Sequence, residues 1–259
     1  MFENLLVERD GAVAVVTIRR PQVLNALSHA TLVELGQAIA DAGLDTAVRA
    51  VVLTGAGTKA FVAGADVKEI SDMAPDRARA HAEHGQRVFD AIERLDKPSI
   101  AAINGVALGG GCELAMACTL RIAADTARFG QPEIDLGLVP GFAGTQRLPR
   151  LIGRGPALEL LLTGQSISAA EALRLGLVNR VVPAGEVMST ALDLAAQLSR
   201  KAPIAVRQLL RLVACGLDGS TADGQRLEAE AFGVVAASQD AREGTRAFLE
   251  KRTPVFTGR

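Results

Sequence analysis

The chain has 259 residues, of which 49% are hydrophobic and 22% charged, and its formal net charge is −1. This composition is typical of a globular enzyme, and the balanced charge argues against nucleic acid and anionic membranes as partners. No apolar run approaches the ~18 residues of a membrane span, and the N-terminus lacks the basic and apolar regions of a signal peptide. Cys112, Cys118 and Cys215 lack metal-ligand spacing, which indicates reduced thiols and predicts a cytoplasmic protein.

The N-terminal part of the sequence favours a hairpin followed by a helix. Residues 4–8 and 12–19 have the apolar pattern of strands, and Asp10-Gly11 between them is typical of a tight turn. Ser28 can cap a helix that runs to about residue 42. The sequence therefore predicts that an antiparallel pair of strands begins the fold.

The next segment predicts two strands separated by a loop and helices. Residues 48–54 are apolar on both faces, which indicates a strand inside a sheet. Residues 55–66 are rich in glycine and alanine and are expected to form a loop. Short and long helices are expected over residues 66–73 and 75–96, and a buried strand over residues 98–103.

A glycine-rich stretch, Asn104 to Glu113, follows this strand and leads into strong helix formers up to Cys118. Residues 121–124 favour another strand, and residues 129–133 an irregular segment. The unit of strand, glycine-rich turn and helix is therefore the central feature of the sequence.

The C-terminal half is mostly helical in pattern. Helices are expected over residues 141–152 and 156–163, and Ser168 opens another through a capping box with Glu171. After a strand at residues 177–182, helices alone are predicted, with breaks near Pro203, Gly219 and Gln239. This order predicts an α/β core, residues 1–195, and a helical C-terminal region, residues 196–259.

The glycine-rich stretch has two readings. Its glycines let the backbone approach a ligand, and a helix N-terminus presents unpaired N–H groups, so the stretch can bind negative charge. It lacks the endings of nucleotide-binding loops, and its glycines could equally serve close packing of helix on strand. Glu113 could act chemically or could simply favour the positive end of the helix dipole.

A second acid and a second loop extend this pattern. Glu133 follows Pro132, and if it converged with Glu113 the two carboxyls could act as general acid and general base. The loop that ends at Ala65-Asp66 also leads into a helix, so both loops could give one N–H to one oxyanion. Asp66 could instead be an ordinary helix cap, and spacing alone leaves these alternatives open.

Two further groups have simpler interpretations. His81 and His84 lie three residues apart on a predicted helix, which would suit a metal, but charged neighbours favour a solvated face. Cys112 adjoins the glycines without a nearby histidine in sequence, so a small buried apolar residue is expected. No metal site is predicted.

Several motifs together resemble the crotonase superfamily, and most closely the enoyl-CoA hydratases. The resemblance covers nearly the whole chain in the family's order. Its motifs are residues 59–69, 104–117, 129–133 with Gly137, Pro140-Gly141, 144–148, 162–164, 172–182 and 247–252.

The resemblance implies a ββα spiral core, C-terminal helices that drive trimerisation, often as a dimer of trimers, and an acyl-CoA thioester substrate. It implies that the N–H groups of Ala65 and Gly110 form an oxyanion hole and that Glu113 and Glu133 are the catalytic acids. Glu113 would act on the water and Glu133 would protonate the α-carbon. The residues implied to contact substrate or CoA are Ala63, Ala65, Asp66, Val67, Lys68, Gly109 and Gly110, with Lys251 and Phe248 from a neighbouring subunit. No metal, flavin or nicotinamide cofactor is implied.

Both acids are present, which favours a hydratase over the isomerases and decarboxylases of the superfamily, since these typically lack one of them. An isomerase, or other acyl-CoA chemistry on a specialised substrate, is the alternative among enzymes, and a binding-only protein is the alternative outside them. Phe142 departs from the family pattern, where small residues are frequent. Its ring would either narrow the acyl pocket or point into the core.

Overall fold

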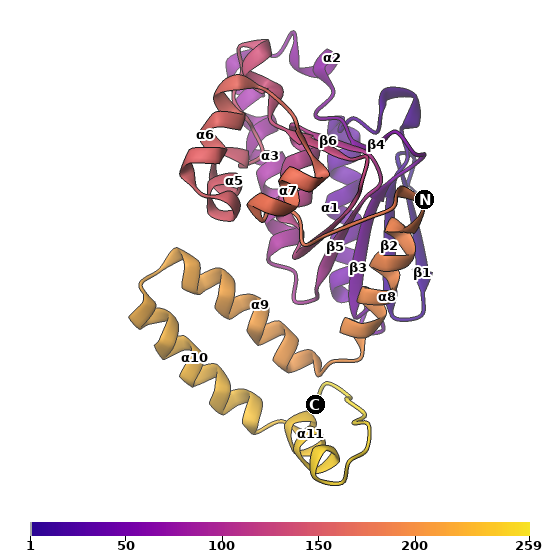
Figure 1. Ribbon diagram of the computed structural model, residues 1–259, viewed down its shortest axis with the longest axis vertical. Helices are drawn as coiled ribbons and strands as arrows, with labels where there is room; N and C mark the ends of the chain where they lie inside the picture. The colour runs from indigo at the N-terminus through magenta and orange to yellow at the C-terminus, as the bar shows by residue number, and fades with distance from the viewer. Residues whose placement is uncertain (1) are drawn as a thin grey trace.

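The computed structural model describes residues 2–259, which form two β-sheets surrounded by helices (Figure 1). The larger sheet has six strands in the order β1-β2-β3-β5-β7-β10. They are β1 (Leu5–Asp10), β2 (Val13–Ile18), β3 (Ala50–Gly55), β5 (Ser99–Ile103), β7 (Leu120–Ala124) and β10 (Arg180–Val182). β1 and β2 pair antiparallel and the remaining pairs are parallel, so the α/β prediction is confirmed.

The larger sheet follows closely from the sequence pattern. Every residue of β3 and β5 is buried, as expected for apolar strands inside a parallel sheet. The hairpin turns at Gly11, whose φ of 57° lies in the left-handed region that glycine tolerates. All six strands of this sheet overlap segments predicted as strands.

The smaller sheet was not expected from the sequence. It contains four short strands: β4 (Ala60–Val62), β6 (Val106–Leu108), β8 (Arg128–Gly130) and β9 (Ile167–Ser168). The assignment of residues 55–66 to a loop and of residues 129–133 to an irregular segment is therefore wrong in part. Strands of two or three residues are too short to show a period of two, and their partners are distant in sequence.

Helices pack around the sheets in the order that the sequence predicts. They are α1 (His29–Leu44), α2 (Val67–Ile70), α3 (Pro75–Glu93), α4 (Gly110–Ala117), α5 (Gly144–Ile152), α6 (Arg154–Thr163), α7 (Ala169–Leu175) and α8 (Val187–Ser199), with 3₁₀ turns η1 (Pro21–Val23), η2 (Pro132–Leu136) and η3 (Ala184–Glu186). The predicted caps form: Ser28 Oγ accepts the Thr31 N–H at 3.2 Å, and Ser168 Oγ accepts the Glu171 N–H at 3.2 Å. α8 packs against β2, β3, β5 and β7.

Three further helices extend away from the sheets (Figure 1). They are α9 (Pro203–Asp218), α10 (Thr221–Ala236) and α11 (Gln239–Leu249), with breaks where the sequence predicts them. α9 and α10 pack side by side. The predicted division after residue 195 falls inside α8, and it stays a prediction.

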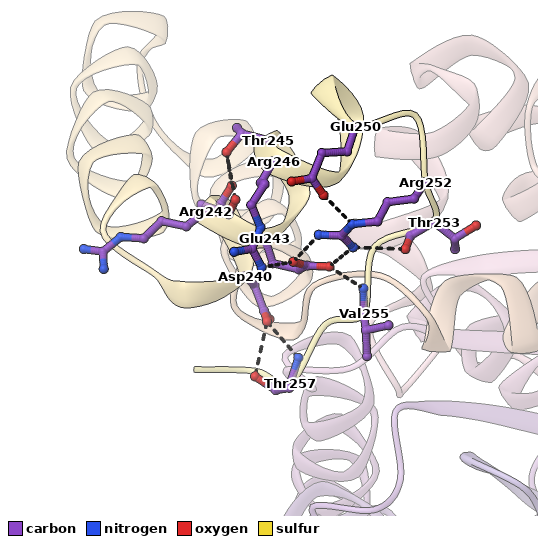
Figure 2. Close-up of polar contacts among 11 residues, drawn as sticks. Asp240, Arg242, Glu243, Thr245, Arg246, Glu250, Arg252, Thr253, Val255 and Thr257 are labelled. Atoms are coloured by element: carbon purple, nitrogen blue, oxygen red, sulfur yellow. Dashed lines mark hydrogen bonds and ion pairs between the residues drawn. The ribbon is translucent and has the colours of Figure 1, made fainter.

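Buried and paired carboxylates hold the C-terminal segment against α11 (Figure 2). Asp240 is buried and accepts the N–H groups of Thr257 and Gly258 at 2.7 and 2.8 Å. Glu243 binds the Arg252 guanidinium and the Val255 N–H, and these bonds hold the pKa of its carboxyl well below the usual range. The turn after α11 therefore has a fixed conformation.

Within residues 2–259, no helix combines the length and apolar character needed to cross a membrane.

Candidate active site

Two backbone N–H groups lie side by side where β4 and β6 end. The strands are parallel neighbours, so the residues after them, Ala65 and the start of α4 at Gly110, emerge at the same edge. A Cβ placed on Gly110 would lie 3.3 Å from the nitrogen of Ala65. Neither N–H donates a hydrogen bond to another group within residues 2–259. The edge therefore presents two neighbouring backbone N–H groups that no acceptor within residues 2–259 occupies.

The glycines beside these donors serve both of the purposes that the sequence leaves open. Gly111 packs directly on the carbonyl of Val62, where a side chain would collide, so this glycine permits close packing. Gly109 has a φ of 49°, and a Cβ there would lie 2.8 Å from Glu133 Oε1. Gly109 therefore keeps open the space between the donors and the second acid.

Glu113 lies in the first turn of α4 and is only 1% exposed. Its Oε1 accepts the N–H of Phe142 at 2.8 Å and that of Gly144 at 2.6 Å. Ala143 between them has a φ of 75°, a left-handed conformation that aims both N–H groups at one oxygen. Oε2 accepts no hydrogen bond from residues 2–259, so one oxygen is anchored and the other is free for chemistry.

Arg147 braces the loop that anchors Glu113. Its guanidinium is buried and donates to the Phe142 carbonyl at 2.9 Å, to Asp90 at 2.6 Å and to Glu93 at 2.7 Å. Arg147 therefore links α3 to the loop of Phe142, whose N–H binds the Glu113 carboxyl. Sequence reasoning assigned no role to Arg147, because its helix also carries the exposed Arg150 and nothing in the local sequence distinguishes the two.

Glu133 lies in the first turn of η2, directly after β8. The buried amide of Gln131, oriented with its nitrogen toward this acid, donates to both carboxylate oxygens at 3.1 Å. A Cβ on Gly144 would meet the Gln131 amide at 2.8 Å and Glu113 Oε1 at 2.9 Å, so Gln131 lies between the two acids. The convergence of Glu113 and Glu133, which spacing leaves open, is therefore present.

The environment of the two acids favours shared protonation. Burial, followed by the charge of Glu133, raises the pKa of Glu113 to about 8. Burial also raises the pKa of Glu133. At neutral pH the pair consequently holds at least one proton, and the N–H groups of Phe142 and Gly144 stabilise the charged form of Glu113. A pair in this state can give a proton and take one.

The residues expected to contact CoA divide into two groups. Ala63, Asp66, Val67 and Lys68 surround the start of α2 beside the Ala65 donor, and Asp66 is held by Arg20 at 3.0 Å. Phe248 and Lys251 are exposed at the end of α11, far from α2 (Figure 1). One copy of the chain therefore does not bring the two groups together.

Phe142 points into the core and also borders the site. It is buried, with its ring 5.4 Å from that of Phe89 and 5.4 Å from that of His81 between centroids. A Cβ on Gly110 would lie 3.2 Å from its Cε2 atom. The ring therefore points into the core beside Gly110, and a narrowing of the acyl pocket by Phe142 stays a prediction.

Two further expectations concern the histidines His81 and His84 and the thiol of Cys112. The solvated face expected for His81 and His84 is wrong, because both rings are half-buried beside a cavity. No cluster of three metal-ligating side chains occurs within the described chain. Cys112 is buried as expected, and burial raises the pKa of its thiol to about 12.

The two sheets with their projecting C-terminal helices define the crotonase fold class. A family model described as enoyl-CoA hydratase/isomerase matches residues 8–259, and the chain belongs to this family.

Relatives and solved structures agree with this assignment over nearly the full length. A short-chain-enoyl-CoA hydratase of Clostridium acetobutylicum is 49% identical over 97% of this chain and 96% of its own length. A crotonyl-CoA hydratase of Syntrophomonas wolfei is 46% identical over 98% of both chains. The crystal structure of an enoyl-CoA hydratase from Bacillus anthracis has a TM-score of 0.96 at 41% identity, and covers 99% of this chain and 100% of that one. The predicted crotonase fold is confirmed.

Proposed function

We propose that the protein adds water reversibly to the double bond of trans-2-enoyl-CoA, giving 3-hydroxyacyl-CoA. The observation that carries the proposal is a pair of glutamates, Glu113 buried and Glu133 half-buried, beside two unpaired backbone N–H groups. The names of the relatives, short-chain-enoyl-CoA hydratase and crotonyl-CoA hydratase, support a short acyl group as substrate.

In this proposal the thioester oxygen accepts the N–H groups of Ala65 and Gly110. When water adds to the β-carbon, electrons of the double bond move toward the carbonyl and the oxygen becomes enolate-like. Preorganised donors stabilise this charge without rearrangement, and losing one donor typically costs ~2.7–4 kcal/mol. Gly110 also begins α4, whose dipole favours negative charge at that end.

The two glutamates move the protons. The reactive state is the one in which the proton of the pair is on Glu133 and Glu113 is charged. In this state Glu113 takes a proton from the water through its free oxygen while the hydroxyl forms its bond to the β-carbon. Glu133 gives its proton to the α-carbon as the enolate collapses, so the product gains one molecule of water. Exchange between the carboxyls and solvent then restores the starting protonation.

The proposed chemistry requires no cofactor, because protein groups supply both carbonyl polarisation and proton transfer. CoA enters as part of the substrate and would contact Ala63, Asp66, Val67 and Lys68 beside the donors. Lys251 and Phe248 would reach it from a neighbouring copy in a trimer or a dimer of trimers.

The activity is tested by following loss of the enoyl thioester absorbance when crotonyl-CoA is mixed with the protein. We expect 3-hydroxybutyryl-CoA as product and the reverse reaction from that product. A parallel reaction with 3-enoyl-CoA distinguishes an isomerase from a hydratase. Turnover of 3-enoyl-CoA to 2-enoyl-CoA without hydration would replace the hydratase proposal, and CoA binding without any turnover would indicate a binding-only protein.

A further inference from the structure

A basic cavity of about 660 Å³ lies between α1, α2 and α3. Its lining includes His29, Glu69, Arg77, His81, His84 and Arg87. The chain has three histidines, and all of them line this one cavity. Such a concentration of basic side chains needs an explanation, because the net charge of the whole chain is only −1.

The cavity has hydrogen-bond donors without acceptors. Arg77 and Arg87 are exposed at the rim of the cavity, and neither forms an ion pair within residues 2–259, whereas Arg79 on the same helix binds Glu83 at 2.8 Å. Both ring nitrogens of His81 and the Nε2 of His84 are buried without a hydrogen-bond partner in the described chain.

The one acid of the lining, Glu69, offsets only one of the two arginine charges. Glu69 Oε2 accepts the backbone N–H of His29 at 2.7 Å. Unpaired buried polar groups are costly, so the arrangement suits a ligand that brings acceptor oxygens and negative charge.

The cavity adjoins the proposed active site on two sides. α2, which carries Glu69, starts two residues after the Ala65 donor. On the other side, the ring of His81 packs against Phe142, whose far edge borders Gly110 and whose N–H holds Glu113. The Phe142 ring therefore lies between Gly110 and the His81 wall of the cavity, and an acyl group whose thioester oxygen binds Ala65 and Gly110 would reach the cavity by passing beside this ring.

We infer that the cavity binds a carboxylate at the far end of the acyl group, so that the favoured substrates are trans-2-enoyl-CoA thioesters with a terminal carboxylate. The inference rests on the proposed function and narrows its substrate class. The guanidinium groups of Arg77 and Arg87 supply the charge and can bind a carboxylate through two parallel N–H donors. The histidine rings supply further N–H donors that are buried and unpaired in the free protein.

Equilibrium binding tests this inference without relying on turnover. Two saturated acyl-CoA thioesters of equal chain length, one ending in a carboxylate and one in a methyl group, are titrated into the protein by calorimetry. We expect the carboxylate form to bind about tenfold tighter, as charge-assisted hydrogen bonds allow. The double variant Arg77→Met/Arg87→Met should lose this preference while its affinity for the methyl form changes less than twofold.

Arg79→Met is the matched control, because Arg79 lies on the same helix but is already paired with Glu83. It should keep the preference. Equal binding of both ligands to the unmodified protein, or a preference that survives in the double variant, would overturn the inference. Hydration of crotonyl-CoA is measured in the same preparations, so a failure of the proposed activity is recognised separately.

Discussion

At the scale of single residues, the position of Glu113 depends on groups that take no part in the chemistry. Phe142 and Gly144 fix one carboxylate oxygen, and Ala143 accepts a left-handed backbone to make this possible. Backbone conformations of this kind persist only where the surroundings enforce them. Here the enforcing contact is the bond from Arg147 to the Phe142 carbonyl.

Replacing Arg147 with methionine should therefore damage catalysis more than stability. The loop loses its brace, and misplacing a reacting group by about 1 Å costs up to ~100-fold in rate. We expect kcat for crotonyl-CoA to fall by about 10- to 100-fold with KM nearly unchanged. The alkaline fall of kcat/KM is expected near pH 8, where the pair of Glu113 and Glu133 loses the proton that Glu133 must donate. Because the charge of Arg147 lowers the pKa of Glu113, its removal should move this fall to higher pH.

Arg150→Met provides the control, since Arg150 lies one turn further along α5 and is exposed. Its kcat and pH profile should match those of the unmodified protein. An Arg147→Met variant with a normal pH profile and normal kcat would show that the brace does not act on Glu113.

At the scale of elements, the site is assembled by the smaller sheet. β4, β6 and β8 are parallel neighbours, and the residues that follow them are Ala65, Gly110 with Glu113, and Gln131 with Glu133. The carboxyl ends of neighbouring parallel strands meet at one edge, which brings segments distant in sequence together.

The smaller sheet is also the part of the fold that the sequence does not predict. The residues Glu113 and Glu133 and both loops can be singled out from composition and turn chemistry alone. Their convergence cannot, because it depends on three strands of three residues each, and such strands leave no period in the sequence. The N–H groups of Phe142 and Gly144 escape sequence reasoning for the same reason, since their partner Glu113 lies on another element.

Gly109→Ala tests the spatial requirement at the end of β6. The new methyl group would lie 2.8 Å from Glu133 Oε1 on a backbone with a φ of 49°, so both the acid and the chain must shift. We expect at least a tenfold loss of kcat/KM for crotonyl-CoA, from displacement of Glu133. Gly155→Ala, where a Cβ meets nothing within 4 Å, should keep full activity. Equal activity of the two variants would contradict this role for Gly109.

At the scale of the whole molecule, the projecting helices carry an apolar surface with no cover in a single chain. Leu209, Val213 and Leu217 on α9 and Phe232 on α10 are exposed, the last at 75%. Contiguous apolar surface of this kind normally marks an interaction site. The helical pattern of the sequence predicted α9, α10 and α11 correctly. That these helices project from the sheets cannot be predicted from local sequence, because their position depends on the surface that packs against them.

The proposed assembly predicts that Leu217→Asp/Phe232→Asp yields monomers in sedimentation velocity. Placing two charges in a desolvated interface is strongly unfavourable. The KM for crotonyl-CoA should rise, because Lys251 and Phe248 of a neighbouring copy no longer reach the CoA. Val33→Asp, on the exposed face of α1, should leave mass and KM unchanged. A double variant with unaltered mass would contradict the interface.

The central claim is that Glu113 and Glu133 together perform the hydration. Its most direct test is kcat/KM for crotonyl-CoA in Glu113→Gln, Glu133→Gln and the double variant, with thermal melting and CoA-ester binding as controls for folding. We expect each single variant to lose about 10²- to 10⁴-fold, the range typical of general acid–base groups, with binding retained and the double variant little worse. A folded single variant with the activity of the unmodified protein would contradict the two-carboxyl mechanism.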